Sequence, residues 1–184
     1  MRELSLHILD LAQNSIEAGA KNLVIAIDEN ENGFFVFSIE DDGRGMSQEL
    51  LQQVRDPFTT TRLSRKVGMG IPFIDMVTQQ CGGHLEMTSE KGRGTKLAAY
   101  FAAGNIDMPP LGDIAASIRV LLAGAPWLEL DFSYACDGRR LDFSTRQVRE
   151  ILGDAADFAN PEISLWLEEY LKQEIAKVKG MEVQ

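Results

Sequence analysis

Two β-rich segments separated by a short polar turn constrain the fold of this chain more than any other feature. Residues 23–28 are LVIAID, residues 34–40 are FFVFSIE, and ENENG lies between them. β-branched and aromatic side chains favour strands, and Asn-Gly favours a tight turn. The pattern therefore predicts a β-hairpin close to the N-terminus.

Other segments before residue 104 also carry clear local signals. Leu4, Ile8, Leu11 and Ile16 recur near helical spacing and predict an amphipathic helix over 2–18 that ends at Ala18-Gly19. The remaining expectations, in chain order, are a glycine-rich loop at 41–45, a short helix at 47–54 capped by Ser47, a loop at 55–69, a helix from 71, and strands at 84–90 and 95–101 joined by a KGRG turn.

The chain after residue 104 is predicted to form a second, smaller region. Pro109-Pro110 marks a linker, and a helix is expected over 113–123. Asp137-Gly138 between two alternating segments predicts a hairpin of strands 128–134 and 140–143. Ser144 and Gln147 resemble a capping box for a helix to Leu152. Asn160-Pro161 is expected to open a last helix with one apolar face, made of Ile163, Trp166, Leu167, Tyr170, Leu171 and Ile175.

Composition limits the classes of partner. The 184 residues carry a formal net charge of −10, which disfavours general binding to nucleic acid or anionic membranes. The charged start is unlike a signal peptide, and no apolar run approaches the ~20 residues that span a bilayer, so a cytoplasmic location is expected. Cys81 and Cys136 lie far apart in sequence and are expected to be buried, reduced thiols.

Two short motifs could bind a nucleotide from opposite sides. Asp10 and Asn14 are four residues apart and share a helix face, so their oxygens could serve Mg²⁺ and proton chemistry, although two solvated polar side chains are the better explanation of this pair taken alone. In DDGRG at 41–45, Gly43 and Gly45 allow close approach of a flat ligand, and an ionised Asp accepts hydrogen bonds from an amine. An ordinary glycine-rich turn is the alternative.

Two further motifs follow in the same order along the chain. DPFTTTRLSRKVGMG at 56–70 combines hydroxyls and basic side chains directly before a helix, and backbone N–H groups at a helix start attract phosphate. GRGT at 92–95 enters the final strand, where Thr95 could bond a base or its ordered water. A solvated loop and a β-turn remain the simpler alternatives for each motif alone.

Together, LDLAQNSIEAGA, EDDGRGM, DPFTTTR…VGMGI and CGGHLEMTSEKGRGT resemble the N, G1, F/G2 and G3 boxes of the GHKL (Bergerat-fold) superfamily of ATPases and kinases. The resemblance covers roughly residues 4–102. It implies an α+β, two-layer α/β sandwich with helices on one face of a mixed sheet. A histidine-kinase-like ATP-binding domain is expected at 1–104, with a small α/β extension at 105–184.

The resemblance also implies roles for individual residues. Asn14 is the expected Mg²⁺ ligand, Asp10 the catalytic acid, and Asp41 the carboxylate that recognises adenine. The expected ATP-contacting set is Asn14, Asp41, Gly43, Gly45, Met46, Thr60, Arg62, Lys66, Gly68, Met69, Gly70 and Thr95.

The sequence departs from the superfamily pattern at two positions. Asp10 stands where hydrolytic members usually carry Glu, which withdraws the carboxylate by ~1.5 Å. A shift of that size can slow chemistry ~100-fold. Glu17 replaces the Lys often found in histidine kinases, and NSIEAGA resembles the MutL-type N box, whereas PFTTTR resembles histidine kinases.

Three functions follow from these features. The first is a protein kinase of histidine-kinase or anti-sigma-kinase type that phosphorylates a separate partner, which the short lid and the lack of a transducer domain favour. The lack of a dimerisation helix with an acceptor His before the N box counts against it, and His7 is expected to be structural. The second is an ATP-gated interaction switch, and the third is a slow MutL- or gyrase-type ATPase. The sequence leaves the partner, the role of 105–184 and the formation of a homodimer open.

Overall fold

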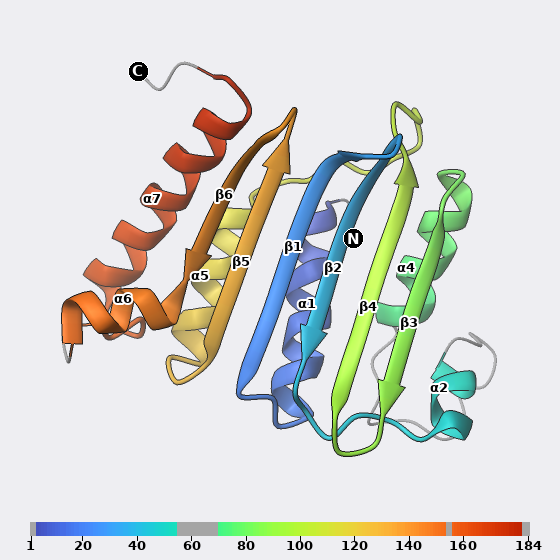
Figure 1. Ribbon diagram of the computed structural model, residues 1–184, viewed down its shortest axis with the longest axis horizontal. Coiled ribbons are helices and arrows are strands. Elements are labelled where there is room, and N and C mark those ends of the chain that lie inside the picture. The colour runs from blue at the N-terminus through green and yellow to red at the C-terminus, as the bar shows by residue number, and fades with distance from the viewer. Residues whose placement is uncertain (1–2, 55–69, 154–155, 182–184) are drawn as a thin grey trace.

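The computed structural model describes residues 3–54, 70–153 and 156–181 of the chain. A six-stranded mixed sheet carries a layer of helices on one face (Figure 1). The helices are α1 (Leu4–Glu17), α2 (Gln48–Val54), α4 (Gly70–Gln80), α5 (Ile114–Gly124), α6 (Thr145–Leu152) and α7 (Pro161–Val178). The strands are β1 (Asn22–Glu31), β2 (Phe34–Asp41), β3 (His84–Glu90), β4 (Gly94–Ala102), β5 (Glu129–Cys136) and β6 (Arg139–Ser144). Within these described ranges, no helix is long and apolar enough to cross a bilayer.

The strand order is β3-β4-β2-β1-β5-β6, and every neighbouring pair is antiparallel except β1 and β5. The predicted hairpin of β1 and β2 therefore lies at the centre of the sheet. The expected α+β, two-layer sandwich with a mixed sheet is confirmed.

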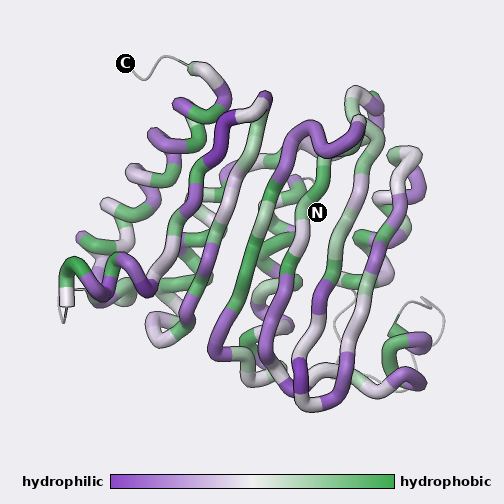
Figure 2. The backbone as a smooth tube through the Cα atoms, in the orientation of Figure 1, coloured by the Kyte–Doolittle hydropathy of each residue, from purple (hydrophilic) through white to green (hydrophobic). Residues whose placement is uncertain are grey.

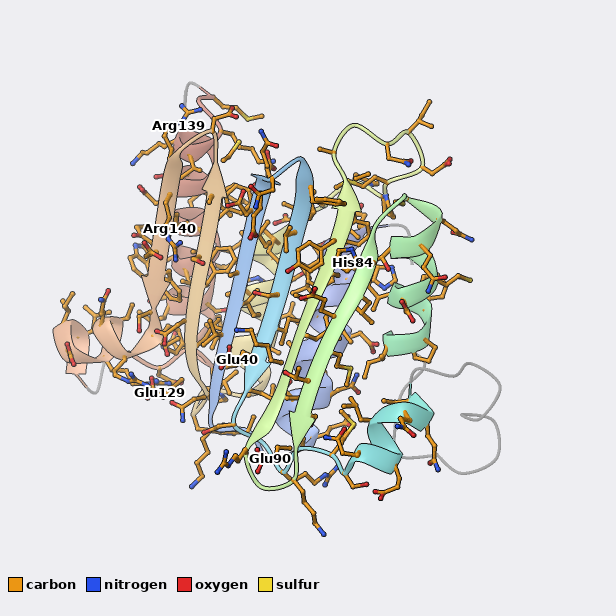
Figure 3. All side chains as sticks on the ribbon, turned by 45° about the vertical axis from the view of Figure 1, so that its right-hand side comes forward. Glu40, His84, Glu90, Glu129, Arg139 and Arg140 are labelled. Atoms are coloured by element: carbon orange, nitrogen blue, oxygen red, sulfur yellow. The ribbon has the colours of Figure 1, made fainter. Side chains whose placement is uncertain are left out.

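The two faces of the sheet differ in polarity. In β1, the side chains of Leu23, Ile25 and Ile27 are buried beneath the helix layer, while Val24 on the opposite face is 41% exposed. Such alternation is typical of a sheet with one covered and one solvated face. Polar residues therefore recur along the strands in Figure 2, and Figure 3 shows Glu40, His84 and Arg140 on the open face.

The C-terminal region extends the same sheet. β5 adds in parallel to β1, with Ile25 opposite Phe132, and α5 packs beside α1. The sheet is thus continuous across the boundary expected at residue 104, and the division of the chain into two domains stays a prediction. Parallel neighbours require a crossover connection, and the chain between β1 and β5 contains β2, α2, α4, β3, β4 and α5.

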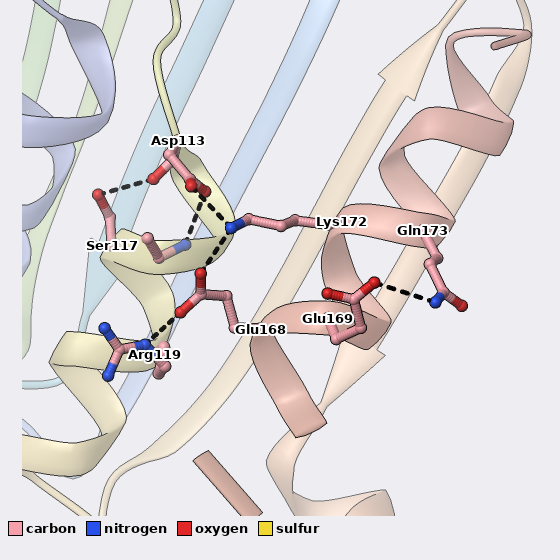
Figure 4. Close-up of polar contacts among 8 residues, drawn as sticks. Asp113, Ser117, Arg119, Glu168, Glu169, Lys172 and Gln173 are labelled. Carbon is pink, nitrogen blue, oxygen red and sulfur yellow. Dashed lines mark hydrogen bonds and ion pairs between the residues drawn. The ribbon is translucent and has the colours of Figure 1, made fainter. Parts of the chain in front are cut away.

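Charged side chains attach α7 to α5. Lys172 Nζ lies 3.0 Å from Asp113 Oδ2 and 2.6 Å from Glu168 Oε1, and Glu168 also pairs with Arg119 (Figure 4). Asp113 has a second function, because its side chain accepts from Ala116 N and caps α5. These contacts hold the last helix in the same layer as α1.

Two local expectations for the C-terminal region are wrong. The side chain of Ser144 makes no capping bond, because β6 continues through it to pair with Asp131. Thr145 forms the local bonds instead and accepts from Leu130 N. Trp166 was expected on the apolar face of the last helix, yet it is 49% exposed and stacks on Tyr170.

A partly buried carboxylate ties the end of α7 to the central strand β1. Glu29 of β1 accepts from Tyr134 Oη and from Cys136 Sγ, and it lies 2.9 Å from Lys179 Nζ. Burial alone would raise the pKa of Glu29, but the bonds from Tyr134, Lys179 and Cys136 lower it overall. Burial and Glu29 together raise the pKa of Cys136 to about 11. Cys81 and Cys136 are both buried, free thiols, as expected.

We predict that Glu29→Gln lowers the free energy of unfolding by about 2 kcal/mol at pH 7, because three donors lose a charged acceptor. The folded-state pKa of Glu29 is depressed, so the stabilisation is present above the unfolded pKa of about 4 and is lost as the pH falls further. Urea unfolding of wild type and Glu29→Gln at pH 7 and at pH 3 measures the loss of unfolding free energy and its dependence on pH. A difference from wild type that stayed constant with pH would contradict the prediction.

Candidate functional site

A partly open cavity of about 130 Å³ lies between α1, the end of β2, the loop that follows β2, and β4. Its apolar walls include Leu11, Ile39, Ile71, Met87 and Leu97. Five of the residues expected at a nucleotide site line it: Asn14, Asp41, Gly45, Met46 and Thr95. A mostly apolar lining with a few polar groups is typical of a small-molecule site.

Asp41 is the carboxylate of this cavity, and two donors fix its orientation. Ser15 Oγ donates to Asp41 Oδ2 at 2.7 Å, and Gly43 N donates to Asp41 Oδ1 at 2.9 Å. Gly43 itself does not line the cavity, so its backbone acts through Asp41. The two contacts leave the remaining lone pairs of the carboxylate for a ligand.

The neighbouring Asp42 has a different environment. It accepts from the backbone N atoms of Lys21 and Asn22 and from Asn22 Nδ2, at 2.7 to 2.9 Å. Slight burial opposes ionisation of Asp42, but these bonds lower its pKa overall. The second Asp of the DDGRG motif therefore fastens the loop to the start of β1, and the first faces the cavity.

The loop after β2 is held on both sides. Arg44 N donates to Ala18 O, and Gly92 N donates to Arg44 O. Gly45 has φ +59°, and a Cβ there would lie within 3.0 Å of Glu90 O, so only glycine fits. The backbone of residues 43–46 consequently follows the cavity edge closely.

Ser89 of β3 joins this loop to β4. Met46 N donates to Ser89 Oγ at 2.8 Å, and Ser89 Oγ lies 2.9 Å from Gly94 O and 2.9 Å from Thr95 Oγ1. Ser89 is buried and is not among the cavity-lining residues. It connects two lining residues, Met46 and Thr95, behind the cavity wall.

The side chain of Asp10, a residue of α1, lies beside the first residue of α4. A Cβ on Gly70 would lie within 3.0 Å of Asp10 Oδ2, so the first residue of α4 packs directly on this carboxylate. The free N–H groups at a helix start carry partial positive charge and favour an anion there. Neither residue lines the cavity, but the adjacent Ile71 does, so both lie at its edge.

Asn14 has an unsatisfied amide. Its Nδ2 atom is buried and has no hydrogen-bond partner. Buried polar groups without partners are rare and are often completed by a ligand. No group of three or more His, Cys, Asp and Glu side chains suited to a metal occurs in the described part of the chain. A cation here would therefore depend on one amide oxygen together with the oxygens of a bound ligand, which is the manner in which Mg²⁺ binds with phosphates.

The other expected contacts, Thr60, Arg62, Lys66, Gly68 and Met69, lie outside the described residues. The sequence did not point to Ser15 or Ser89, since a single Ser inside a motif has no characteristic spacing. His7 is a packed histidine, as expected. It stacks on Phe73 with ring centroids 5.1 Å apart, and burial lowers its pKa.

The fold and the cavity define a nucleotide-binding domain of known class. The profile of the family described as histidine kinase-, DNA gyrase B-, and HSP90-like ATPase matches residues 2–104, and the chain belongs to that family. It is a member of the GHKL superfamily, as its four sequence boxes indicated.

Two of the relatives carry the names of kinases. The chain is 32% identical to sporulation kinase C of Bacillus subtilis over 94 residues, which cover 50% of this chain and 22% of the kinase. It is 26% identical to the sensor histidine kinase ZraS of Escherichia coli over 106 residues, which cover 57% of this chain and 23% of that protein. The chain thus spans less than a quarter of the length of these curated relatives.

Solved structures show the same fold over a longer stretch. The N-terminal domain of a DNA repair protein aligns with a TM-score of 0.56 at 12% identity, covering 85% of this chain and 58% of that one. The Aquifex aeolicus MutL ATPase domain complexed with ADP aligns with a TM-score of 0.53 at 14% identity, covering 83% and 69%. The shared fold therefore reaches beyond the residues that match the family profile.

We predict that Gly70→Ala changes the melting temperature little, since the new Cβ meets only the end of the Asp10 side chain and Gly70 is the first residue of α4. It should nevertheless slow ATP turnover about 100-fold, because the new Cβ displaces the Asp10 carboxylate. Gly124→Ala, where no atom lies within 4 Å of the new Cβ, is the control. Equal turnover in both variants would show that the contact between Gly70 and Asp10 is irrelevant to the chemistry.

Proposed function

We propose that this chain binds Mg·ATP in the cavity beside Asp41 and transfers the γ-phosphate to a partner protein in signalling. The main support for this proposal is that Asn14, Asp41 and Thr95 line one cavity in a chain of this ATPase family. The sensor kinases among its relatives favour transfer to a protein over other fates of the phosphate.

The base would bind at the end of the cavity formed by β2 and β4. Asp41 is paired with Thr95 in the β2–β4 register, so their side chains reach the cavity from adjacent strands. An ionised carboxylate accepts but cannot donate, which suits the exocyclic amine of adenine. Gly43, Gly45 and Met46 would support the base through the backbone of the loop after β2.

The phosphates would bind between Asn14 and the start of α4. The amide oxygen of Asn14 can ligate Mg²⁺ without adding charge beside the phosphates. Backbone N–H groups at Gly70 favour the anionic end of the nucleotide. By the superfamily pattern, Thr60, Arg62, Lys66, Gly68 and Met69 would complete the phosphate contacts. The bound cation would neutralise charge on the transferred group.

Asp10 is the proposed catalytic residue. It lies one helical turn before Asn14 on α1, on the same face. Its carboxylate could orient the attacking group of the partner or accept the proton of that group. The partner, the cytoplasmic location and the formation of a homodimer are parts of the same proposal.

An ATP-gated interaction switch is the second candidate, and one observation favours it. The C-terminal region exposes large apolar side chains, with Ile151 of α6 at 81% and Leu165 of α7 at 61% exposed. Exposed apolar surface can mark a protein-binding site. In this alternative, ATP would change the affinity of the chain for a partner without phosphate transfer.

Incubation of the pure protein with γ-labelled ATP, Mg²⁺ and candidate partners distinguishes these functions. Label on a partner supports the kinase, and free phosphate alone supports an ATPase of the MutL or gyrase type. Saturable ATP binding with neither product supports the switch. Absence of ATP binding would contradict all three.

We predict that Asp41→Asn abolishes measurable ATP binding, a loss of more than about 100-fold. The substitution replaces a charged acceptor by a group that also presents a donor to the amine of the base. Isothermal titration calorimetry with Mg·ATP measures the loss. Asp131→Asn removes the same charge from an exposed position on β5 and should retain wild-type affinity.

We also predict that Asn14→Asp weakens binding of Mg·ATP about tenfold or more, because it adds a negative charge beside the phosphates. Asn105→Asp adds the same charge outside the cavity lining and is the matched control. The same calorimetric titration applies. An affinity of Asn14→Asp equal to that of wild type would place Asn14 away from the phosphates.

A further inference from the structure

The hydroxyl group of Ser89 has three polar contacts but only one proton to donate. Its Oγ atom accepts from Met46 N and lies 2.9 Å from both Gly94 O and Thr95 Oγ1. A serine hydroxyl has one proton and two acceptor sites. If Ser89 donates to Gly94 O, all three contacts are hydrogen bonds only when Thr95 donates to Ser89.

The opposite arrangement loses a hydrogen bond. If Ser89 donated to Thr95, the carbonyl oxygen of Gly94 would receive no proton from Ser89, and the hydroxyl proton of Thr95 would be free. Gly94 and Ser89 are both buried, so water would not readily replace the bond lost by the Gly94 carbonyl oxygen. The geometry therefore favours the state in which the Thr95 hydroxyl donates to Ser89 Oγ. In this state Thr95 presents only lone pairs to the cavity.

Three further donors close to Asp41 are also used within the protein. Ser15 Oγ and Gly43 N both donate to Asp41, and Met46 N donates to Ser89. Asp41 and Thr95 consequently present acceptors alone to a ligand at this end of the cavity. A base with an exocyclic amine matches two acceptors, whereas a carbonyl at the same position would face them oxygen to oxygen.

We propose that Ser89 is a positioning residue that fixes the hydroxyl of Thr95 as an acceptor and thereby selects purines with a 6-amino group. The inference rests on the proposed binding of ATP in this cavity and adds a residue that lies behind its wall. Ser89 acts through Thr95, which is its register partner across β3 and β4, and does not itself line the cavity.

The test compares two nucleotides that differ only in the amine: ATP and purine riboside triphosphate, which carries hydrogen at position 6. Calorimetry with Mg²⁺ gives the dissociation constants for wild type, Ser89→Ala, Thr95→Val and the double variant. Ser89→Ala should weaken ATP about fivefold to tenfold, the equivalent of one hydrogen bond, and purine riboside triphosphate less than about twofold. The double variant should lose no more than Thr95→Val alone, because both changes remove one shared effect.

Two further variants separate positioning from general damage. Ser89→Thr keeps the hydroxyl and should retain the wild-type preference for ATP over purine riboside triphosphate. Ser133→Ala, on the open face of β5, should also leave this preference unchanged. An unaltered ratio of the two affinities in Ser89→Ala, or additive losses in the double variant, would overturn the role of Ser89 alone. Failure of the wild type to bind ATP would instead overturn the proposed function and this inference together.

Discussion

The hydrogen bond from Ser15 to Asp41 is the contact on which the site depends. It joins the helix layer to the sheet, since Ser15 lies on α1 and Asp41 is the last residue of β2. Asn14 precedes Ser15, so the same bond fixes the distance between the amide and the carboxylate that face one cavity. Gly43 N holds the second oxygen of Asp41 and prevents rotation of the carboxylate. A charge-assisted bond of this kind is stronger than a neutral one, and it makes the cavity a property of the folded chain before any ligand arrives.

The central position of β1 separates the site from the C-terminal region. β2 and β4 continue the sheet on one side of β1 and carry the cavity, while β5 and β6 continue it on the other (Figure 1). Every residue that lines the cavity precedes residue 98, so the described part of the C-terminal region contributes none of them. It supports the site indirectly, because α5 packs beside α1 and Glu29 anchors the end of α7 to β1. The surface of α6 and α7 is therefore available for a role other than nucleotide binding.

Much of the fold could be predicted because its signals are local. The hairpin of β1 and β2 follows from two β-rich runs and an Asn-Gly turn, and the order of four short motifs indicated the family. The parallel addition of β5 to β1 could not be predicted, since no local pattern reports which strand lies beside which. The same reason explains the two missed serines: Ser89 matters only because the register places it opposite Thr95, and Ser15 only because α1 crosses the end of β2. The capping box at Ser144 failed because pairing with β5 claimed that residue for the sheet.

The contact between Asp10 and Gly70 bears on the choice between transfer and hydrolysis. The space at the start of α4 admits the Asp10 carboxylate only because Gly70 has no side chain. A Glu in this position would need room for another methylene group, and the shorter Asp reaches ~1.5 Å less far toward the phosphates. A water molecule held only by the acid would then be poorly placed for attack, and misplacement on this scale costs about 100-fold in rate. The side chain of a docked partner is positioned by its own protein and depends less on the reach of the acid. Within the proposed function, the pairing of a short acid with a glycine would thus suit a protein acceptor better than water.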